Sequence, residues 1–242
     1  MRADLGTWRT TWGQALLDLL YPARCPGCGS PSPTLCAACR RTVRPVPLPH
    51  CPRCGATLAP SGRCAICANR PPALVALHSV GRFDGVLRTA IHRFKYRGRT
   101  DLARPLARLL AEAWREVGQP AAVVVPVPQH PLRTRERGYI PTALLTGHLA
   151  SLLSLPHVPQ ALVRCRHTPP QVGLSGSARW QNVRDAFATG PQASQITGRA
   201  VVLVDDVATT GATLSASATA CRAAGTGPIF ALVLAHDPPV GG

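Results

Sequence analysis

The sequence predicts an α/β protein in which a parallel β-sheet carries helices on both faces, preceded by a small cysteine-rich module. After residue 70, apolar segments of strand length alternate with segments of helical periodicity, as they do in parallel sheets. Residues 25–67 instead contain four Cys-x2-Cys pairs and almost no aromatic content. At 242 residues the chain has room for one domain of about 150 residues and a smaller unit. We therefore expect an N-terminal unit over residues 1–70 and a second domain over residues 71–242.

The expected strands are rich in branched apolar residues, which suits strands that are buried on both faces of a parallel sheet. In the second strand, Pro126 and Pro128 cannot donate ladder hydrogen bonds, so we expect a loop to start there. We assign all of these segments to one parallel sheet: residues 74–83, 122–128, 161–164, 201–204 and 229–234.

The expected helices show apolar residues three or four positions apart. The first of them carries Trp8, Trp12 and Leu16 on one face and ends before Pro22. The apolar face of the helix at residues 101–117 is expected to pack in the core. The helical segments cover residues 8–20, 86–94, 101–117, 142–153 and 214–224.

The cysteine pairs have the spacing of zinc knuckles, in which both thiolates of a pair bind the same tetrahedral Zn²⁺. We favour two sites built from consecutive pairs, and a cross-braced module that exchanges the pairs is the alternative. Four thiolates leave no open coordination position, so we expect structural zinc, which a segment too small for its own core would need. The expected ligands are Cys25, Cys28, Cys36 and Cys39 at one site, and Cys51, Cys54, Cys64 and Cys67 at the other.

Two adjacent carboxylates, Asp205 and Asp206, follow the apolar strand 201–204 and precede a turn of small residues that opens a helix. Ligands of open α/β sheets bind at the carboxyl ends of the strands. A Gly-containing turn at a helix N-terminus directs backbone N–H groups and the positive end of the helix dipole toward one point. Residues 201–213 therefore predict a site for a phosphate ester. The alternative is a buried strand that ends in two solvated acids and a capping turn.

This segment resembles the signature of type I phosphoribosyltransferases, which bind 5-phosphoribosyl-1-pyrophosphate (PRPP). The resemblance implies that Asp205 and Asp206 hold the ribose, beside Mg²⁺, and that the following loop wraps the 5-phosphate. The residues of that loop are Ala208, Thr209, Thr210, Gly211, Ala212 and Thr213.

The same resemblance gives a role to the loop after the second strand. In these enzymes that loop holds pyrophosphate, which makes Val127, Pro128 and Gln129 candidates by position. The basic segment that follows, with Arg133 and Arg137 before Gly138, is similar to mobile loops that close over PRPP and exclude water. A solvated basic loop without that role is the alternative.

Several motifs together resemble the ComF (GntX-like) family of competence and DNA-uptake proteins. One departure concerns the Arg-Gly-aromatic motif, which Asn-Gln usually follows in the family and Ile140-Pro141 follows here. The resemblance implies a role in moving transforming single-stranded DNA into the cytoplasm, with competence or DNA-processing proteins as partners. Besides the cysteine pairs and the PRPP loop, it rests on residues 94–98, 125–128, 137–139 and 171–187.

The formal net charge of +16 comes almost wholly from arginine, because Lys95 is the single lysine. A basic surface attracts phosphates and nucleic acid without specificity. The N-terminal segment lacks the apolar core of a signal peptide, and no run of about 18 apolar residues occurs to span a bilayer. We therefore expect a cytoplasmic protein that binds single-stranded DNA weakly and in a salt-dependent manner.

The alternative function is an active phosphoribosyltransferase that transfers phosphoribosyl from PRPP to a base in nucleotide salvage. Thr209 stands where the 6-oxopurine salvage enzymes carry a carboxylate as the proposed base. Threonine cannot take a proton at neutral pH, which disfavours that substrate class. A PRPP sensor without turnover would use the same residues, so we assign no catalytic residue.

Overall fold

The structure is a computed structural model that describes residues 24–32, 35–118, 123–131, 134–135, 138–166, 168 and 176–238. The helix expected at residues 8–20 lies outside this range. Within it, no helix is long and apolar enough to cross a membrane.

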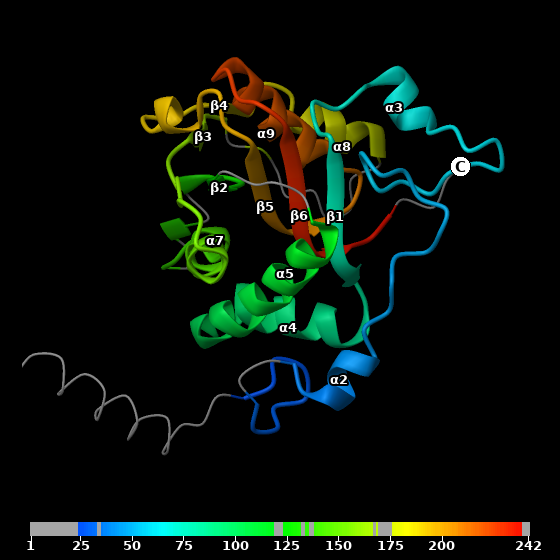
Figure 1. Ribbon diagram of the computed structural model, residues 1–242, viewed down its shortest axis with the longest axis vertical. Helices are drawn as coiled ribbons and strands as arrows, with labels where there is room; N and C mark the ends of the chain where they lie inside the picture. Colours follow the sequence, from blue (N-terminus) through cyan, green and yellow to red (C-terminus); the bar gives the residue numbers. More distant parts are fainter. Residues whose placement is uncertain are drawn as a thin grey trace, which may run out of the picture.

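The centre of the molecule is a parallel sheet with the strand order β1-β6-β5-β2, which confirms the predicted fold class (Figure 1). All eight residues of β6 are buried, as expected for a central strand with both faces covered. The strands of this sheet are β1 Ala76–Arg82, β2 Val123–Pro126, β5 Val201–Ala208 and β6 Ile229–His236.

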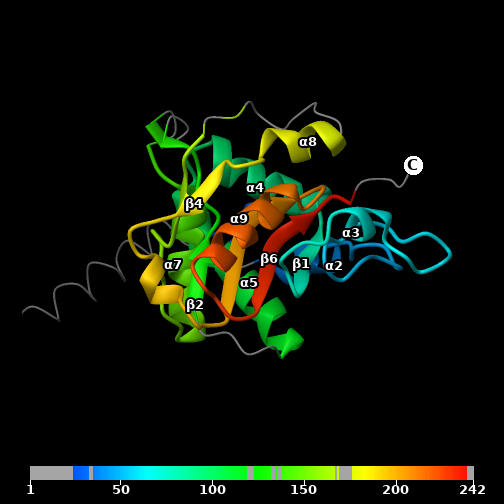
Figure 2. The same ribbon diagram turned by 90° about the horizontal axis from the view of Figure 1, so that it is seen from above.

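Helices cover both faces of the sheet (Figure 2). Alternate residues along each strand point to opposite sides, so each strand contributes to two separate cores. Phe230, Leu232 and Leu234 of β6 belong to one core, and Ile229, Ala231 and Val233 belong to the other. The first core packs against α4 Gly85–Tyr96, α5 Ala103–Val117 and α7 Pro141–Leu153, and the second against α9 Ala212–Ala223. The short 3-10 helices are η1 Thr100–Leu102 and η2 Ala193–Ile196.

The prediction that residues 161–164 join the parallel sheet is wrong. Strand β3 Leu162–Arg164 pairs antiparallel with β4 Phe187–Thr189 in a separate two-stranded sheet, and α8 Gly176–Asn182 lies between them in sequence. Leu162 and Phe187 are buried in the core beside α9, whereas Val163 is 36% exposed. A strand with one solvated face cannot occupy the interior of a parallel sheet.

The end of β5 also differs from the prediction. The strand does not stop at residue 204 but continues to Ala208, because Asp205, Val207 and Ala208 find ladder partners on β6. The two aspartates therefore lie inside the last half of the strand, beside β6.

The cysteine-rich segments form two ribbons that contact different parts of the α/β domain. Ribbon 1 comprises residues 24–32 and 35–42, with α2 Ala37–Arg41, and ribbon 2 comprises residues 50–69, with α3 Ala65–Asn69. Figure 1 shows α2 close to α4, whereas α3 lies apart from it, beside the upper part of the sheet. Cys25 and Leu35 of ribbon 1 join the core of α4 and α5, while ribbon 2 has a small apolar cluster of its own.

Candidate functional site

The acid pair on β5 meets the single lysine of the chain. Lys95, near the end of α4, places its Nζ 2.6 Å from Oδ1 of Asp206. Both side chains are largely covered, with 19% of the lysine and 5% of the aspartate side chain exposed. Asp205 retains more exposure, and its Oδ1 accepts a hydrogen bond from the backbone N–H of Asp206 at 2.9 Å. The site thus holds two carboxylates and one ammonium group.

The charges of these three side chains are strongly coupled. Burial by itself lowers the pKa of Lys95, but the carboxylates of Asp206 and Asp205 outweigh it, so that pKa is raised from its usual value. Burial and the adjacent charge of Asp206 raise the pKa of Asp205 to about 8. One ammonium group is therefore not enough to keep both carboxylates ionised, and a second cation or a hydroxyl donor would be favourable here.

Two buried polar atoms at this place have no hydrogen-bond partner among the described residues. They are Oδ2 of Asp206 and Oγ1 of Thr210. Asp206 is 3% exposed and Thr210 is 4% exposed. Leaving a buried polar group unpaired costs about 1–3 kcal/mol, and more for a charged group, so native proteins rarely do so without a functional reason. Both atoms belong to the segment that the sequence singles out as a phosphate-ester site.

The loop from Ala208 to Thr213 turns the chain from β5 into α9. Gly211 caps the helix in the left-handed conformation, with a φ of 71°, and its carbonyl accepts the N–H of Ser215. The first N–H groups of α9 have no partners within the helix and point toward the loop. Ala208 and Thr209 are held through their carbonyls, by the N–H of Asp237 at 2.9 Å and by Nε2 of His236 at 3.2 Å. Thr209 and Thr213 stay partly exposed.

The loop after β2 lies at the same edge of the sheet, because β2 is the neighbour of β5. The backbone of Val127 in this loop is fixed by two hydrogen bonds. Its N–H donates to the carbonyl of Val204 at 2.9 Å, and its carbonyl accepts a hydrogen bond from the hydroxyl of Thr142. Val127 is therefore placed to position the loop, while Pro128 and Gln129 are partly exposed. Arg133 and Arg137 lie outside the described residues.

Two of the sequence motifs meet beside this loop. The hydroxyl of Tyr139 donates to the carbonyl of Phe94, which immediately precedes Lys95 on α4. The unusual Ile140-Pro141 pair begins α7, with Ile140 as its N-cap and Pro141 in its first turn. The structure thus brings residues 94–95, 127–129, 138–139 and the acid pair to one region.

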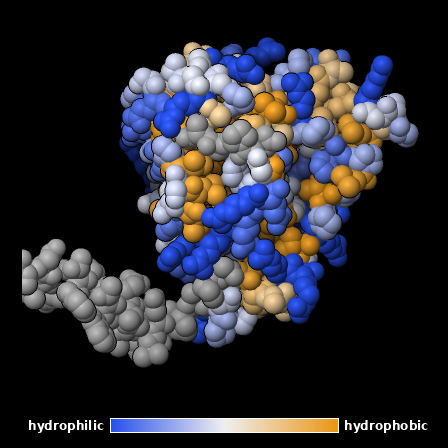
Figure 3. Space-filling model, in the orientation of Figure 1, coloured by the Kyte–Doolittle hydropathy of each residue, from blue (hydrophilic) through white to orange (hydrophobic). Residues whose placement is uncertain are grey.

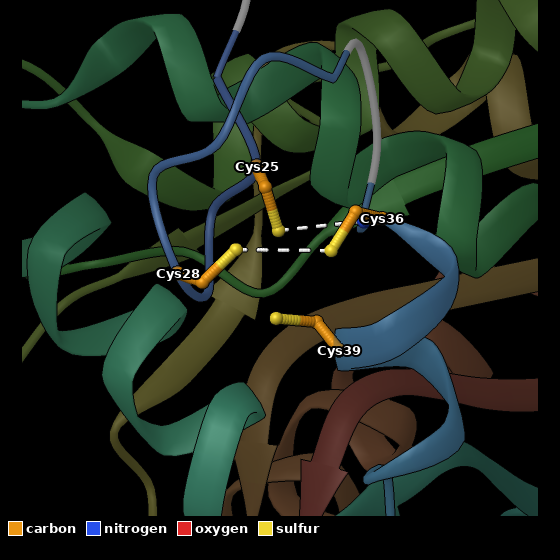
Figure 4. A group of neighbouring side chains, drawn as sticks. All are labelled: Cys25, Cys28, Cys36 and Cys39. Carbon is orange, nitrogen blue, oxygen red and sulfur yellow. Dashed lines mark hydrogen bonds between the residues drawn. The ribbon is translucent and has the colours of Figure 1, made fainter.

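The cysteines form two groups, each with four Sγ atoms within 4.8 Å of one another: Cys25, Cys28, Cys36 and Cys39, and Cys51, Cys54, Cys64 and Cys67. Figure 4 shows the side chains of the first group pointing toward a common centre. The grouping is the consecutive one that we favoured over the cross-braced alternative.

The sulfur positions fit a tetrahedral zinc ion. Four thiolates at about 2.3 Å from Zn²⁺ lie about 3.8 Å apart. The Cys28–Cys36, Cys51–Cys67 and Cys54–Cys64 sulfur distances are 3.7, 3.6 and 3.5 Å. The hydroxyl of Ser30 lowers the pKa of Cys28 to about 6, whereas burial raises that of Cys39 to about 12. A divalent cation would let such unequal thiols ionise together.

Sequence reasoning missed two residues that the fold brings to the site. Lys95 belongs to a motif that we noted, but nothing in its local sequence shows that it reaches Asp206. His236 ends the last strand and is 2% exposed, and it reaches Thr209 only because β6 lies beside β5.

A cavity of ≈ 580 Å³ lies away from the acid pair, between α8, β4 and α9. Its walls include Trp180, Phe187 and small residues of α9, with Arg184 at its border. The guanidinium of Arg70 lies 5.8 Å from the centre of the Trp180 ring. None of the residues that we predicted for PRPP binding contributes to these walls.

Comparison with known proteins agrees with the two cysteine groups. Residues 16–68 match the family model of the double zinc ribbon domain. Competence protein F of Haemophilus influenzae is 34% identical over 188 residues, which cover 75% of this chain and 81% of that protein. The DNA utilization protein YhgH of Salmonella typhimurium is 35% identical and that of Escherichia coli K12 is 33% identical, each over 187 residues with the same coverage of both chains.

Among solved structures, glutamine PRPP amidotransferase from B. subtilis is 20% identical with a TM-score of 0.40, over 59% of this chain and 30% of that chain. Adenine phosphoribosyltransferase from Thermoanaerobacter pseudethanolicus is 19% identical with a TM-score of 0.35, over 54% and 77% of the two chains. These curated relatives match 75% of this chain at more than 30% identity. The chain therefore belongs to the ComF family, together with competence protein F and the DNA utilization protein YhgH.

Proposed function

We propose that this protein binds PRPP with Mg²⁺ at the end of β5 and acts in the uptake of transforming single-stranded DNA. The observation that carries the PRPP site is that two buried atoms, Asp206 Oδ2 and Thr210 Oγ1, find no hydrogen-bond partner in the part of the chain that the structure describes. They lie on a strand end and a helix-opening loop, where a ribose hydroxyl and a phosphate oxygen would satisfy them. The names of the relatives support the part that concerns DNA.

In this proposal each element contacts a different part of the ligand. Asp205 and Asp206 accept hydrogen bonds from the ribose hydroxyls and provide the hard oxygen ligands that Mg²⁺ prefers. Ala208, Thr209, Thr210, Gly211, Ala212 and Thr213 surround the 5-phosphate with N–H and hydroxyl groups. The pyrophosphate lies toward Pro128 and Gln129, where Arg133 and Arg137 would neutralise it.

Lys95 has a defined part in this arrangement. Its ammonium, 2.6 Å from Oδ1 of Asp206, neutralises that carboxylate and reduces the electrostatic repulsion between Asp205 and Asp206. With Mg²⁺-PRPP bound at the carboxylates, the same ammonium would add a positive charge beside the anionic ligand. A buried lysine at this point thus keeps the empty site stable and adds a positive charge to the occupied one.

Calorimetry of Mg²⁺-PRPP binding tests the site. Replacing Asp205→Asn together with Asp206→Asn should weaken binding tenfold or more, because charged hydrogen bonds contribute about 1.5–3 kcal/mol each. Asp101→Asn with Asp185→Asn removes the same formal charge elsewhere and should leave the affinity within about twofold, because interactions between separated surface charges are screened. Equal affinities of the two double variants would reject the site.

Turnover is a separate question, which isotope-labelled PRPP answers. Release of labelled pyrophosphate in the presence of one base from a panel would establish a phosphoribosyltransferase in salvage, our alternative function. Tight binding without release would establish a PRPP-binding protein. Thr209 makes the 6-oxopurines the least favoured acceptors, since no carboxylate stands at that position.

The proposed contact with single-stranded DNA has two supports in the structure. Figure 3 shows hydrophilic side chains across the face that α4 and α5 form, where Arg88, Arg97 and Arg104 are exposed. The cavity beside α8 offers the Trp180 ring, with Arg70 over it, as a surface on which a base can stack.

Binding of an oligonucleotide at several salt concentrations tests this part. The affinity should fall steeply with salt, with a log–log slope of about 0.7 for each phosphate contact. Neutralising Arg133, Arg135 and Arg137 together should flatten the slope if that loop follows the backbone. Trp180→Ala should lower the affinity at every salt concentration with an unchanged slope, because stacking releases no counterions. Absence of binding even at low salt would reject the DNA role.

A further inference from the structure

The loop that we assign to the phosphate is in direct contact with ribbon 2. A Cβ atom at Gly211 would lie 3.4 Å from the carbonyl oxygen and 3.8 Å from the Cβ of Cys54. Cys54 is itself buried, at 3% exposure, and is one of the four thiols of the second zinc group. The knuckle therefore lies directly against the residue that caps α9.

A histidine forms a second connection between the same two segments. The ring of His236 lies between Gly55 and the loop: a Cβ at Gly55 would be 2.0 Å from its Cε1, and its Nε2 donates to the carbonyl of Thr209 at 3.2 Å. The backbone of His236 is fixed as well, because its carbonyl accepts the N–H of Phe83 at 3.0 Å. A displacement of Gly55 would therefore move the rigid ring of His236 and, through its hydrogen bond, the carbonyl of Thr209.

Ribbon 2 has little besides its metal to hold its shape. The buried residues of its apolar cluster are Cys51, Cys54 and Ala56, two of which are thiols of the zinc group. Its knuckle is closed by the hydrogen bonds from Cys51 N to Ala56 O and from Gly55 N to Cys51 O, both of 2.8 Å, and it is tied to β1 by Leu77 N and Pro52 O at 2.7 Å. A segment with so small a core depends on the ion for its folded conformation.

We infer that ribbon 2 is the supporting wall of the phosphate loop, so that zinc at Cys51, Cys54, Cys64 and Cys67 and phosphate at residues 208–213 stabilise one another's binding. The inference rests on the proposed PRPP site for its ligand and on the contacts of Cys54, Gly55 and His236 for its mechanism. Because coupling between two binding sites is reciprocal, PRPP should also slow the loss of this zinc ion.

Ribbon 1 provides the matched control. Gly29 and Gly55 each follow the second cysteine of a knuckle, adopt φ values of +83° and +76°, and donate their N–H to Cys25 and Cys51 respectively. A Cβ at Gly29 would meet no atom of the described residues within 4 Å, whereas one at Gly55 would collide with His236. Alanine at either position introduces similar backbone strain, so a different effect of the two substitutions on the phosphate loop is due to the contact of residue 55 with His236.

The test compares Gly55→Ala with Gly29→Ala in the full-length protein. We expect Gly55→Ala to weaken Mg²⁺-PRPP binding at least tenfold and to accelerate amide hydrogen exchange of residues 208–213. Gly29→Ala should change the affinity less than threefold and leave that exchange as it is in the wild type. Equal affinities and equal exchange in the two variants would overturn the inference.

A second pair of variants applies if Gly55→Ala does not fold. Cys64→Ser and Cys36→Ser replace the third thiol of each group, and each should reduce the zinc content by one ion per chain. We expect the exchange of residues 208–213 to accelerate in Cys64→Ser and to change little in Cys36→Ser, and the reverse order would overturn the inference. The exchange readout needs no PRPP, so a wild-type protein that does not bind PRPP would reject the proposed function and leave this result standing.

Discussion

Both zinc ribbons are built from two Cys-x2-Cys pairs and have the same knuckle geometry, but they stabilise different parts of the molecule. In ribbon 1, Gly27 packs against Val86 of α4, and its carbonyl accepts a hydrogen bond from Arg93 at 3.0 Å. In ribbon 2, the corresponding contacts are with β1, His236 and the cap of α9. In both ribbons the cysteine spacing supplies four thiolates for one metal ion, whereas the surface beneath each knuckle determines what that ion supports.

The ribbons also differ in how they are connected to the acid pair. Ribbon 2 contacts the loop that follows Asp206, at Gly211. Ribbon 1 is connected to the pair through α4, which carries Arg93 at the ribbon and Lys95 at the carboxylates. Ribbon 2 therefore affects the geometry of the loop at Gly211, whereas ribbon 1 affects the charge balance of Asp205 and Asp206 through Lys95.

The largest expected effect is the loss of both metals. The protein should contain close to two zinc ions per chain, and chelation should remove about 10–16 kcal/mol of binding free energy per site. Hydrogen exchange should then rise throughout residues 24–69 and next in residues 208–213, whereas residues 201–204 at the centre of the sheet stay protected. Protein purified without chelator that contains no zinc would contradict this expectation.

An intermediate effect is expected at the charge pair that links α4 to β5. Lys95→Met should lower the free energy of unfolding by about 3–5 kcal/mol in urea titrations, because it leaves the carboxylate of Asp206 buried and unpaired. Combining it with Asp206→Asn should restore most of that loss, since both partners are then removed. Arg88→Met, at an exposed position of the same helix, is the control and should change stability little. If Lys95→Met were as mild as Arg88→Met, the connection of ribbon 1 to the site through α4 would be absent.

The smallest effect is expected at the surface of ribbon 1. Arg40 lies 2.5 Å from Glu112 of α5, but the two side chains are 52% and 35% exposed. Arg40→Ala should therefore destabilise the protein by less than about 1 kcal/mol, and added salt should reduce the difference further. A larger, salt-independent loss in thermal unfolding would show that this pair, rather than the packing of Gly27 and Leu35, holds ribbon 1 in place.

Much of the fold could be predicted because its signals are local. The strands at residues 201–204 and 229–234 are continuous apolar runs, and the helix at residues 101–117 has a regular apolar face. The short strand β3 could not be assigned correctly, because its three residues do not show whether the partner is a parallel or an antiparallel strand. The predicted strands did not include its partner β4, whose first residue, Phe187, ends the motif at residues 171–187.

The chemistry of the sites could be read from short sequence patterns: eight thiols at zinc spacing, two carboxylates after an apolar strand segment, and a Thr-Gly loop before a helix. Each of these is a pattern of neighbouring residues, and local spacing is enough to specify it. The packing of the folded chain, in contrast, pairs Lys95 with Asp206 and places ribbon 2, not ribbon 1, against Gly211 through Cys54. These partners are more than 100 residues apart in the chain, and the packing of α4 and β1 around the central strands brings them together.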